Sequence, residues 1–258
     1  MSDRGWHHGR LAAFDIETTG IDYDEDRIVT AALSLVGNGE PIEERGWIVD
    51  PGVEIPAEAS AIHGITTERA RAEGSEPAEV VEEITTQLEA AQDAGIPIVA
   101  FNARFDLTFL DREARRHGVR PLIERVSTLL VVDPFVIDKW INRYRKGSRK
   151  LAAICAFYGA RLDEAHAAES DAIAAARAAW VLAEKGDVVR QVWNPEMGRE
   201  LAELRHEWSA VRHDLPALHD AQIRWAHEQA VSLADYFAEQ GKAKHVEPAW
   251  PIVPFEEG

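Results

Sequence analysis

The sequence predicts an α/β fold in which a mixed sheet of five strands is flanked by helices and followed by a C-terminal helical hairpin. Up to Lys185, short apolar runs rich in β-branched residues alternate with amphipathic segments of helical length. Beyond Val192, apolar residues recur every three or four positions, in two sets that Leu215-Pro216 separates. We therefore divide the chain into a first unit, residues 1–190, and a second unit, residues 191–258.

The composition is that of a folded protein. A chain of 258 residues with 46% hydrophobic residues and eight Trp can build one well-packed domain and a smaller appendage. The single cysteine, Cys155, excludes an internal disulfide and suits a reducing compartment. No signal-like segment and no apolar run of about 18 residues is present, so we expect a cytoplasmic protein with no membrane contact.

Charge is distributed unevenly along the chain. The net charge of -17 argues against the broad basic face with which proteins grip long duplexes. The segment from Lys139 to Lys150 is the exception, with six Lys and Arg residues around a Gly147-Ser148 turn. It is either a solvated face or, through Arg149 and Lys150, a local phosphate contact for a short single strand.

The first strand is expected at Leu11 to Gly20, an apolar run that ends in a Thr-Thr-Gly turn. Arg27 to Val36 is β-branched and apolar, and Gly46 to Val49 offers a third short strand. The turn residues 37–39 lie between the second and third strands, so we expect an antiparallel meander. Before the first strand, His7 and His8 could be read as a metal pair, but we expect a frayed, solvated terminus.

A parallel crossover follows the meander. Ser75 to Ala91 has Pro77 in its first turn and an apolar face at helical spacing, and Ile96 to Phe101 is a short apolar strand. This strand, helix, strand order is typical of parallel pairing, which makes the sheet mixed. A helix is then expected to begin near Asn102, and a last strand over Val126 to Val132.

The remaining elements are helical. The last strand ends at Asp133-Pro134. Asp133 could be an acid behind the metal ligands, but we interpret it as a turn residue that ends the strand. Helices are expected over Phe135 to Tyr144 and Leu151 to Tyr158, and an Ala-rich helix runs to about Lys185. The C-terminal hairpin has one apolar seam, which includes Leu201, Leu204, Trp208, Val211 and Leu215 in its first helix and Ile223, Ala226, Ala230, Leu233 and Phe237 in its second. It either covers the first unit, which we favour, or binds a partner.

Acidic side chains stand at three points of this framework. Asp15 and Glu17 project from the same face of the first strand, which is a geometry for metal ligands. Asp106 falls in a first helical turn, where the helix dipole alone would explain an acid. His166 and Asp171 converge only if His166 lies on a loop and Asp171 in the first turn of the Ala-rich helix.

Three strings, taken in order, resemble the motifs of the DnaQ-like 3'-5' exonucleases. They are D-x-E-T-T-G from Asp15, N-A-x-F-D-x-x-F-L from Asn102, and the pair His166 and Asp171 of the subclass in which His serves as base. The resemblance runs from about Gly9 to Gly186 and implies an RNase H-like fold. Phe101 stands where many relatives have His, which leaves the ligands unchanged but alters the packing behind them.

The resemblance implies a metal-dependent enzyme acting on the 3' ends of nucleic acid. Asp15, Glu17, Asp106 and Asp171 would hold two Mg2+ or Mn2+ ions, and His166 would be the general base. By the same resemblance, the residues that border the terminal nucleotide are Thr18, His63, Ile65 and, with less support, Phe105. The expected substrate is single-stranded or frayed DNA, and the products are nucleoside 5'-monophosphates.

Two other functions stay open at this point. One is an RNA-trimming exoribonuclease of the same fold, which differs mainly in its treatment of the 2' hydroxyl. The other is a non-catalytic module that binds a polymerase or a clamp. Glu228 to Phe237 faintly resembles a clamp-binding peptide, although the helical seam explains the same residues.

Overall fold

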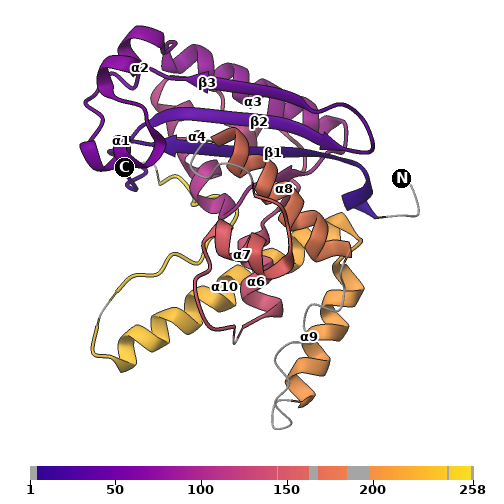
Figure 1. Cartoon of the computed structure of the whole chain (residues 1–258). Helices are drawn as coiled ribbons and strands as arrows, with labels where there is room; N and C mark the ends of the chain where they lie inside the picture. Colours follow the sequence, from indigo (N-terminus) through magenta and orange to yellow (C-terminus); the bar gives the residue numbers. More distant parts are fainter. Residues whose placement is uncertain (1–4, 144, 163–167, 185–197, 243, 257–258) are drawn as a thin grey trace.

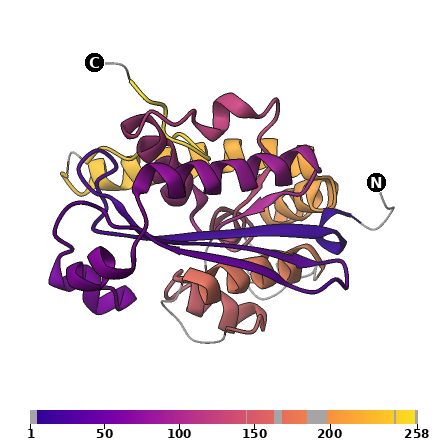
Figure 2. The ribbon, with the colours of Figure 1, turned by 90° about the horizontal axis from the view of Figure 1, so that it is seen from above.

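The computed structural model describes residues 5–143, 145–162, 168–184, 198–242 and 244–256. The described residues form a mixed sheet with helices on both faces, as the two ribbon views show (Figures 1 and 2). The predicted α/β fold with a mixed five-stranded sheet and C-terminal helices is therefore confirmed. Among the described residues, no helix combines the length and the apolar character needed to cross a membrane.

The sheet has the strand order β3-β2-β1-β4-β5. Its strands are β1 (Arg10–Thr18), β2 (Ile28–Gly37), β3 (Glu43–Ile48), β4 (Ile98–Val99) and β5 (Val131–Val132). The first three pair antiparallel, and β4 and β5 continue the sheet in parallel with β1. The last strand is shorter than predicted, because residues 126–130 are irregular and only Val131 and Val132 form a strand.

Helices cover the two faces of the sheet in distinct ways. On one face lie α3 (Pro77–Asp93) and α4 (Ala103–Arg116), and on the other lies α8 (Ala168–Glu184) with α7 (Leu151–Tyr158) against it (Figure 2). The small side chains of α8 let its backbone approach β1 and β2 closely. Shorter helices connect these layers: α1 (Ala57–His63), α2 (Thr67–Glu73), α5 (Leu122–Arg125) and α6 (Pro134–Ile141).

The segment before β1 is ordered and packed. It forms a short 3-10 turn, η1 (Trp6–His8), in which His7 is 2% exposed. Trp6 donates a hydrogen bond from Nε1 to the carbonyl of Arg212 at 2.8 Å and packs against the main core. The prediction of a solvated terminus at His7 and His8 is therefore wrong, because a contact 206 residues away in sequence anchors this turn.

The C-terminal helices α9 (Gly198–Val211) and α10 (Leu215–Glu239) pack on the first unit. Trp225 of α10 is fully buried and stacks on Trp140 of α6, with ring centroids 5.1 Å apart. The predicted apolar seam of the second helix is wrong in part, since Ile223 and Leu233 are 41% and 39% exposed. The buried face is instead rotated toward Leu218, Ala221, Gln222 and Trp225.

This rotation has a clear cause at the edge of the sheet. On α10, His219 accepts a hydrogen bond at Nδ1 from the Val131 amide at 3.1 Å. Gln222 accepts from the Asp133 amide at 2.7 Å and donates to the Val131 carbonyl at 2.9 Å. Two polar side chains of a helix thus satisfy the outer backbone groups of β5, an edge that would otherwise be open to pairing with another strand.

Gln222→Leu should destabilise the chain by about 3 kcal/mol, because it leaves a buried amide and a buried carbonyl of β5 without partners. Urea unfolding monitored by tryptophan fluorescence measures the change. Ile223→Ala, at the exposed neighbouring position, is the matched control and should change stability by less than about 0.5 kcal/mol. Equal losses in the two variants would contradict the role assigned to Gln222.

The C-terminal tail returns along α4. The Val253 amide donates to Thr108 Oγ1 at 3.0 Å, and Arg112 donates to the carbonyls of Val253 and Pro254 at 3.1 and 3.0 Å. Trp250 is 7% exposed and donates from Nε1 to Asp133 at 3.2 Å. The tail is extended, as its proline content indicates, and contacts the first unit from Glu247 to Phe255.

Candidate active site

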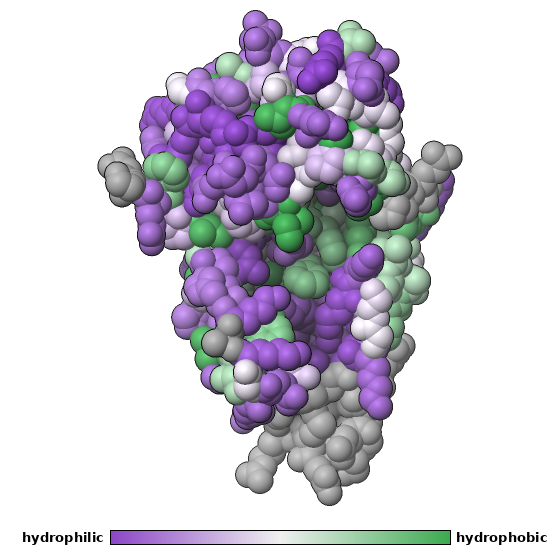
Figure 3. Space-filling model, turned by 90° about the vertical axis from the view of Figure 1, so that its left-hand side faces the viewer, coloured by the Kyte–Doolittle hydropathy of each residue, from purple (hydrophilic) through white to green (hydrophobic). Residues whose placement is uncertain are grey.

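Two acids lie on β1 near its C-terminal end. Phe14 and Ile16 are buried, whereas Asp15 and Glu17 alternate with them and are partly accessible. The register of β1 with β2 shifts between Glu17 and Thr18, where the strand ends. The side of the molecule toward which β1 ends is hollowed near its middle, with apolar residues inside and hydrophilic residues around them (Figure 3).

A third acid comes from the helix that follows β4. Asn102 adopts a left-handed backbone, and α4 begins directly after it, so Asp106 lies in the first turn. Asp106 is 2% exposed and accepts a hydrogen bond at Oδ1 from the Ile16 amide at 3.1 Å. This bond ties the start of α4 to β1 between Asp15 and Glu17, a role that the helix dipole alone does not explain.

A fourth acid comes from the opposite face of the sheet. Asp171 lies in the first turn of α8, where sequence reasoning places it. Its proximity shows in the electrostatics, because the pKa of Glu17 is raised to about 7 by burial and then by the charge of Asp171. The pKa of Asp15 is raised well above its usual value by burial first, then by Asp106, Glu17 and Asp171. Four acids from β1, α4 and α8 are therefore close enough to influence one another's pKa.

These four side chains fit divalent cations. They offer only oxygen ligands, which hard cations such as Mg2+ and Mn2+ prefer. The strongest electrostatic influences on Asp15 are all other carboxylates, so a cation between them would relieve the repulsion that raises these pKa values.

A sequence model of the RNase_T exonuclease family matches residues 12–179. The chain belongs to this exonuclease family. The match confirms the predicted membership in the DnaQ-like 3'-5' exonucleases, and it contains all four acids.

Relatives with curated descriptions are much longer than this chain. "DNA polymerase III PolC-type" of Streptococcus agalactiae is 28% identical over 215 residues, which is 82% of this chain and 14% of that protein. The protein of the same description from Listeria innocua is 31% identical over 169 residues, or 66% of this chain and 11% of its own length. The chain thus spans about a seventh or less of these polymerases.

Solved structures share the fold. Exonuclease I from Methylocaldum szegediense has a TM-score of 0.56 and 22% identity, over 70% of this chain and 42% of its own. E. coli Exonuclease I in complex with a dA16 oligonucleotide has a TM-score of 0.58 and 19% identity over the same shares. The similarity confirms the predicted RNase H-like architecture of this chain.

The electrostatics of the four acids predict an unusual pH dependence of stability. Glu17 has a pKa of about 7 in the folded chain, against 4.5 for an ordinary glutamate, and Asp15 and Asp106 are shifted in the same direction. An acid whose pKa is raised on folding stabilises the folded state below its unfolded pKa and loses this contribution as pH rises through its folded pKa. The metal-free chain should therefore lose stability as pH rises from about 4.5 to about 7.

Thermal unfolding in chelator between pH 4.5 and pH 8 tests this expectation. The matched variant Glu17→Gln should show a smaller fall in melting temperature than the wild type over that window. Addition of Mg2+ or Mn2+ at pH 8 should restore stability to the wild type. Identical pH slopes in the two chains would contradict the assignment of Glu17 to the acid cluster.

The residues expected around a terminal nucleotide occupy several environments. Thr18 is 8% exposed and donates to the Gly20 carbonyl at 2.5 Å. His63 ends α1 and accepts a hydrogen bond at Nδ1 from the Ile65 amide at 3.2 Å. Burial lowers the pKa of His63, and the nearby Thr18 backbone partly offsets this by raising it. The structure thus brings His63 near the end of β1, where the acids lie.

The two apolar residues of this predicted set are less accessible. Ile65 is 5% exposed and packs in a small cluster with Val29 and Ile55, so little of its surface is left for a nucleotide. Phe105 is half-buried and packs against Tyr23 and Phe109, with ring centroids 6.2 and 4.8 Å apart. His166 lies outside the described residues, and its role stays a prediction.

The basic segment from Lys139 to Lys150 is stabilised by local ion pairs and hydrogen bonds. Arg149 pairs with Asp138, which is fully buried, and also donates to the Asn142 carbonyl at 2.7 Å. Arg145 pairs with the same carboxylate at 3.0 Å. The Arg149 guanidinium therefore orders this turn, whereas Lys150 is exposed at the start of α7. Phosphate binding by Arg149 and Lys150 stays a prediction, with Lys150 the more accessible cation.

Sequence patterns did not identify Glu169, and they indicated only part of the role of Asp133. Glu169 also raises the pKa of Asp15, and its Oε1 atom lies 2.5 Å from where a side chain on Gly46 would begin. Its place beside β3 depends on packing across the sheet, which no local spacing signals. Asp133 was expected to be a turn residue, and it does cap α6, but it also accepts bonds from the Asn102 and Ala103 amides at the start of α4.

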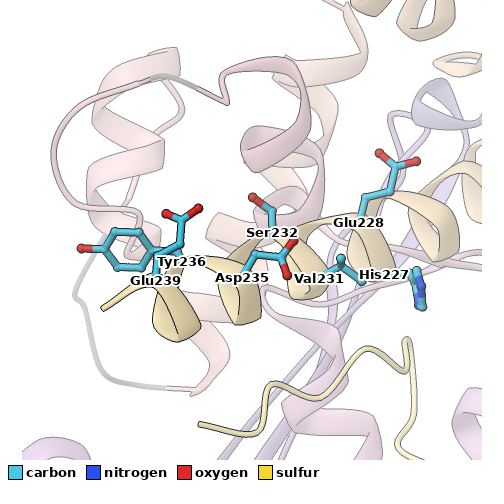
Figure 4. Close-up of a pocket in the computed structure, with 7 residues that line it drawn as sticks. All are labelled: His227, Glu228, Val231, Ser232, Asp235, Tyr236 and Glu239. Atoms are coloured by element: carbon cyan, nitrogen blue, oxygen red, sulfur yellow. The ribbon is translucent and has the colours of Figure 1, made fainter. Parts of the chain in front are cut away.

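A separate hollow lies on the exposed side of α10, with residues of one helix along it (Figure 4). It is lined by His227, Glu228, Val231, Ser232, Asp235, Tyr236 and Glu239. Three of these seven are acids, which repel phosphates, so the hollow is unsuited to nucleic acid. The segment compared with a clamp-binding peptide falls here and is helical throughout.

Proposed function

We propose that this chain is a metal-dependent 3'-5' exonuclease that hydrolyses phosphodiester bonds at single-stranded or frayed 3' ends of DNA. Its products would be nucleoside 5'-monophosphates. The observation that carries the proposal is the convergence of Asp15, Glu17, Asp106 and Asp171 from three elements, with raised pKa values at Asp15, Glu17 and Asp106. Membership in the exonuclease family supports it.

The four acids would hold two Mg2+ or Mn2+ ions. Such ions, when bound, lower the pKa of an attacking water and stabilise the charge on the leaving 3' oxygen. His166 would accept the proton of that water, because a histidine side chain ordinarily has a pKa of about 6.5. Asp106 is positioned for its role by the Ile16 amide, which holds its carboxylate against β1. Thr18 and His63 would border the terminal nucleotide.

DNA is the substrate that the comparisons favour. The PolC-type relatives are DNA polymerases by description, and solved Exonuclease I structures contain dA16 and dT13 oligonucleotides. The net charge of -17 suits contact with a short strand end more than with a long duplex. The description of the same relatives as polymerases supports a polymerase as partner. A cytoplasmic location stays a prediction from the sequence.

Digestion of three oligonucleotides tests the proposal: a single strand of DNA, a 3'-recessed DNA duplex and an all-ribose strand. We expect metal-dependent release of monophosphates, faster from DNA than from RNA, and a loss of about a hundredfold or more in His166→Ala. Faster hydrolysis of the ribose strand would favour an exoribonuclease. No hydrolysis of any substrate by folded protein would favour a non-catalytic module that binds a polymerase or clamp.

A further inference from the structure

Three metal-binding side chains meet far from the acid cluster. His7 Nε2 lies 3.1 Å and His8 Nε2 lies 3.4 Å from the same oxygen, Oε2 of Glu184. The three ligand atoms all lie within 4.8 Å of one another, and among the described residues no other group of three His, Cys, Asp or Glu side chains does so. The four acids of the exonuclease site are spread more widely, in keeping with their mutual repulsion.

The distances between these ligand atoms match those expected around a bound metal ion. Bonds of about 2.0 to 2.1 Å to a tetrahedral Zn2+ place neighbouring ligand atoms about 3.3 Å apart. The two His–Glu distances, 3.1 and 3.4 Å, are close to this value, so a cation could be accommodated with small shifts of His8 and Glu184. These two side chains are 36% and 44% exposed and have room to adjust.

The set is built on ordered elements. His7 is held in place by burial and by its stacking on His213, with ring centroids 5.1 Å apart. Its Nδ1 atom faces Gly5, which leaves Nε2 turned toward Glu184. His8 follows directly in η1, and Glu184 is the last residue of α8. The fixed ligand is therefore buried, and the adjustable ones are at the surface.

Solvent can reach this set. His7 and His8 line an open hollow of about 490 Å³ between the β2–β3 turn and α8, together with Trp180 and Ile42. A hollow of this size gives a cation an entry path and leaves space for water at a remaining coordination position.

We propose that His7, His8 and Glu184 form a second metal site, selective for a transition-metal cation such as Zn2+, that fastens η1 to the end of α8. Two imidazoles and one carboxylate suit Zn2+ and disfavour Mg2+, which prefers oxygen ligands alone. The site is separate from the acid cluster and does not depend on the proposed hydrolytic activity. Asp171 and Glu184 lie 13 residues apart on α8, or about 20 Å along its axis.

Zinc binding to the full-length chain tests the proposal, with a chromophoric chelator as competitor. The Asp15→Asn background disrupts the exonuclease site, so the assay reports the second site. We expect one Zn2+ per chain with a dissociation constant below about 1 μM, and a rise in melting temperature of about 5 °C or more at saturation. Millimolar Mg2+ should produce neither effect in this background.

The variants His8→Ala and Glu184→Gln should each weaken Zn2+ binding by about tenfold or more, and remove most of the thermal shift. They avoid His7, whose replacement would disturb the core. His227→Ala, an exposed histidine on α10, is the matched control and should bind as its parent does. Co2+ in place of Zn2+ gives a visible absorption that should vanish in Glu184→Gln. Unchanged affinity in both variants, or no stoichiometric binding by the parent, would reduce the cluster to an ion pair and overturn the proposal.

Discussion

Replacing Asp15 by Asn should abolish exonuclease activity and, at the same time, stabilise the metal-free chain. The amide has nearly the same shape as the carboxylate but carries no charge. Burial and four neighbouring acids raise the pKa of Asp15, so its ionised form is disfavoured in the folded state. We expect activity to fall by about a hundredfold or more and stability in chelator at pH 8 to rise by about 1 to 2 kcal/mol.

The measurement pairs hydrolysis of a DNA strand with urea unfolding in chelator. Asp93→Asn, at the exposed C-terminal end of α3, is the matched control and should alter neither property appreciably. With Mn2+ present, the order of stability should reverse, because the wild type gains more from the ion than the variant does. A variant that loses activity and stability together in chelator would show that Asp15 supports the fold.

The largest loss of stability is expected from Asp133→Ala. This buried carboxylate accepts four hydrogen bonds, from the amides of Asn102, Ala103 and Phe135 at 2.9 to 3.0 Å and from Trp250 Nε1 at 3.2 Å. It thus joins the starts of α4 and α6 to the C-terminal tail. Removing it leaves several buried donors unpaired, and we expect a loss of about 4 kcal/mol.

Asp214 provides a matched control for this prediction. It also begins a helix, α10, but is exposed and accepts a single bond from the Ala217 amide at 3.1 Å. Asp214→Ala should lower stability by about 1 kcal/mol in the same urea titration. Because α4 carries Asp106, Asp133→Ala should also reduce activity at temperatures where the variant is folded. Equal losses in the two variants would show that Asp133 is an ordinary cap.

The local patterns of the sequence predict most of the framework. The alternation in β1 places Asp15 and Glu17 on one face, and the helical spacing after Ser75 and after Asn102 locates α3 and α4. These predictions succeed because each depends on the periodicity of one segment of the chain.

The features that sequence reasoning missed depend on contacts between distant segments. Gln222 and His219 are polar, so the spacing of apolar residues does not identify the face of α10 that bonds to β5. The turn that holds His7 is fixed by contacts with distant residues: His7 contacts Glu184, 177 positions later, and Trp6 bonds to Arg212. The bond between Asp106 and Ile16 likewise crosses 90 positions, so the resemblance to a family indicated this acid where spacing alone did not.

The central claim is that the acid cluster hydrolyses nucleic acid from its 3' end with divalent cations. Digestion of a 5'-labelled single strand of DNA tests it most directly, with products followed over time in Mg2+, in chelator and with Asp15→Asn. We expect a ladder that shortens one nucleotide at a time from the 3' end and nucleoside 5'-monophosphates as products. Neither should appear in chelator or with the variant. Internal cleavage, shortening from the 5' end, or equal activity in chelator would contradict it.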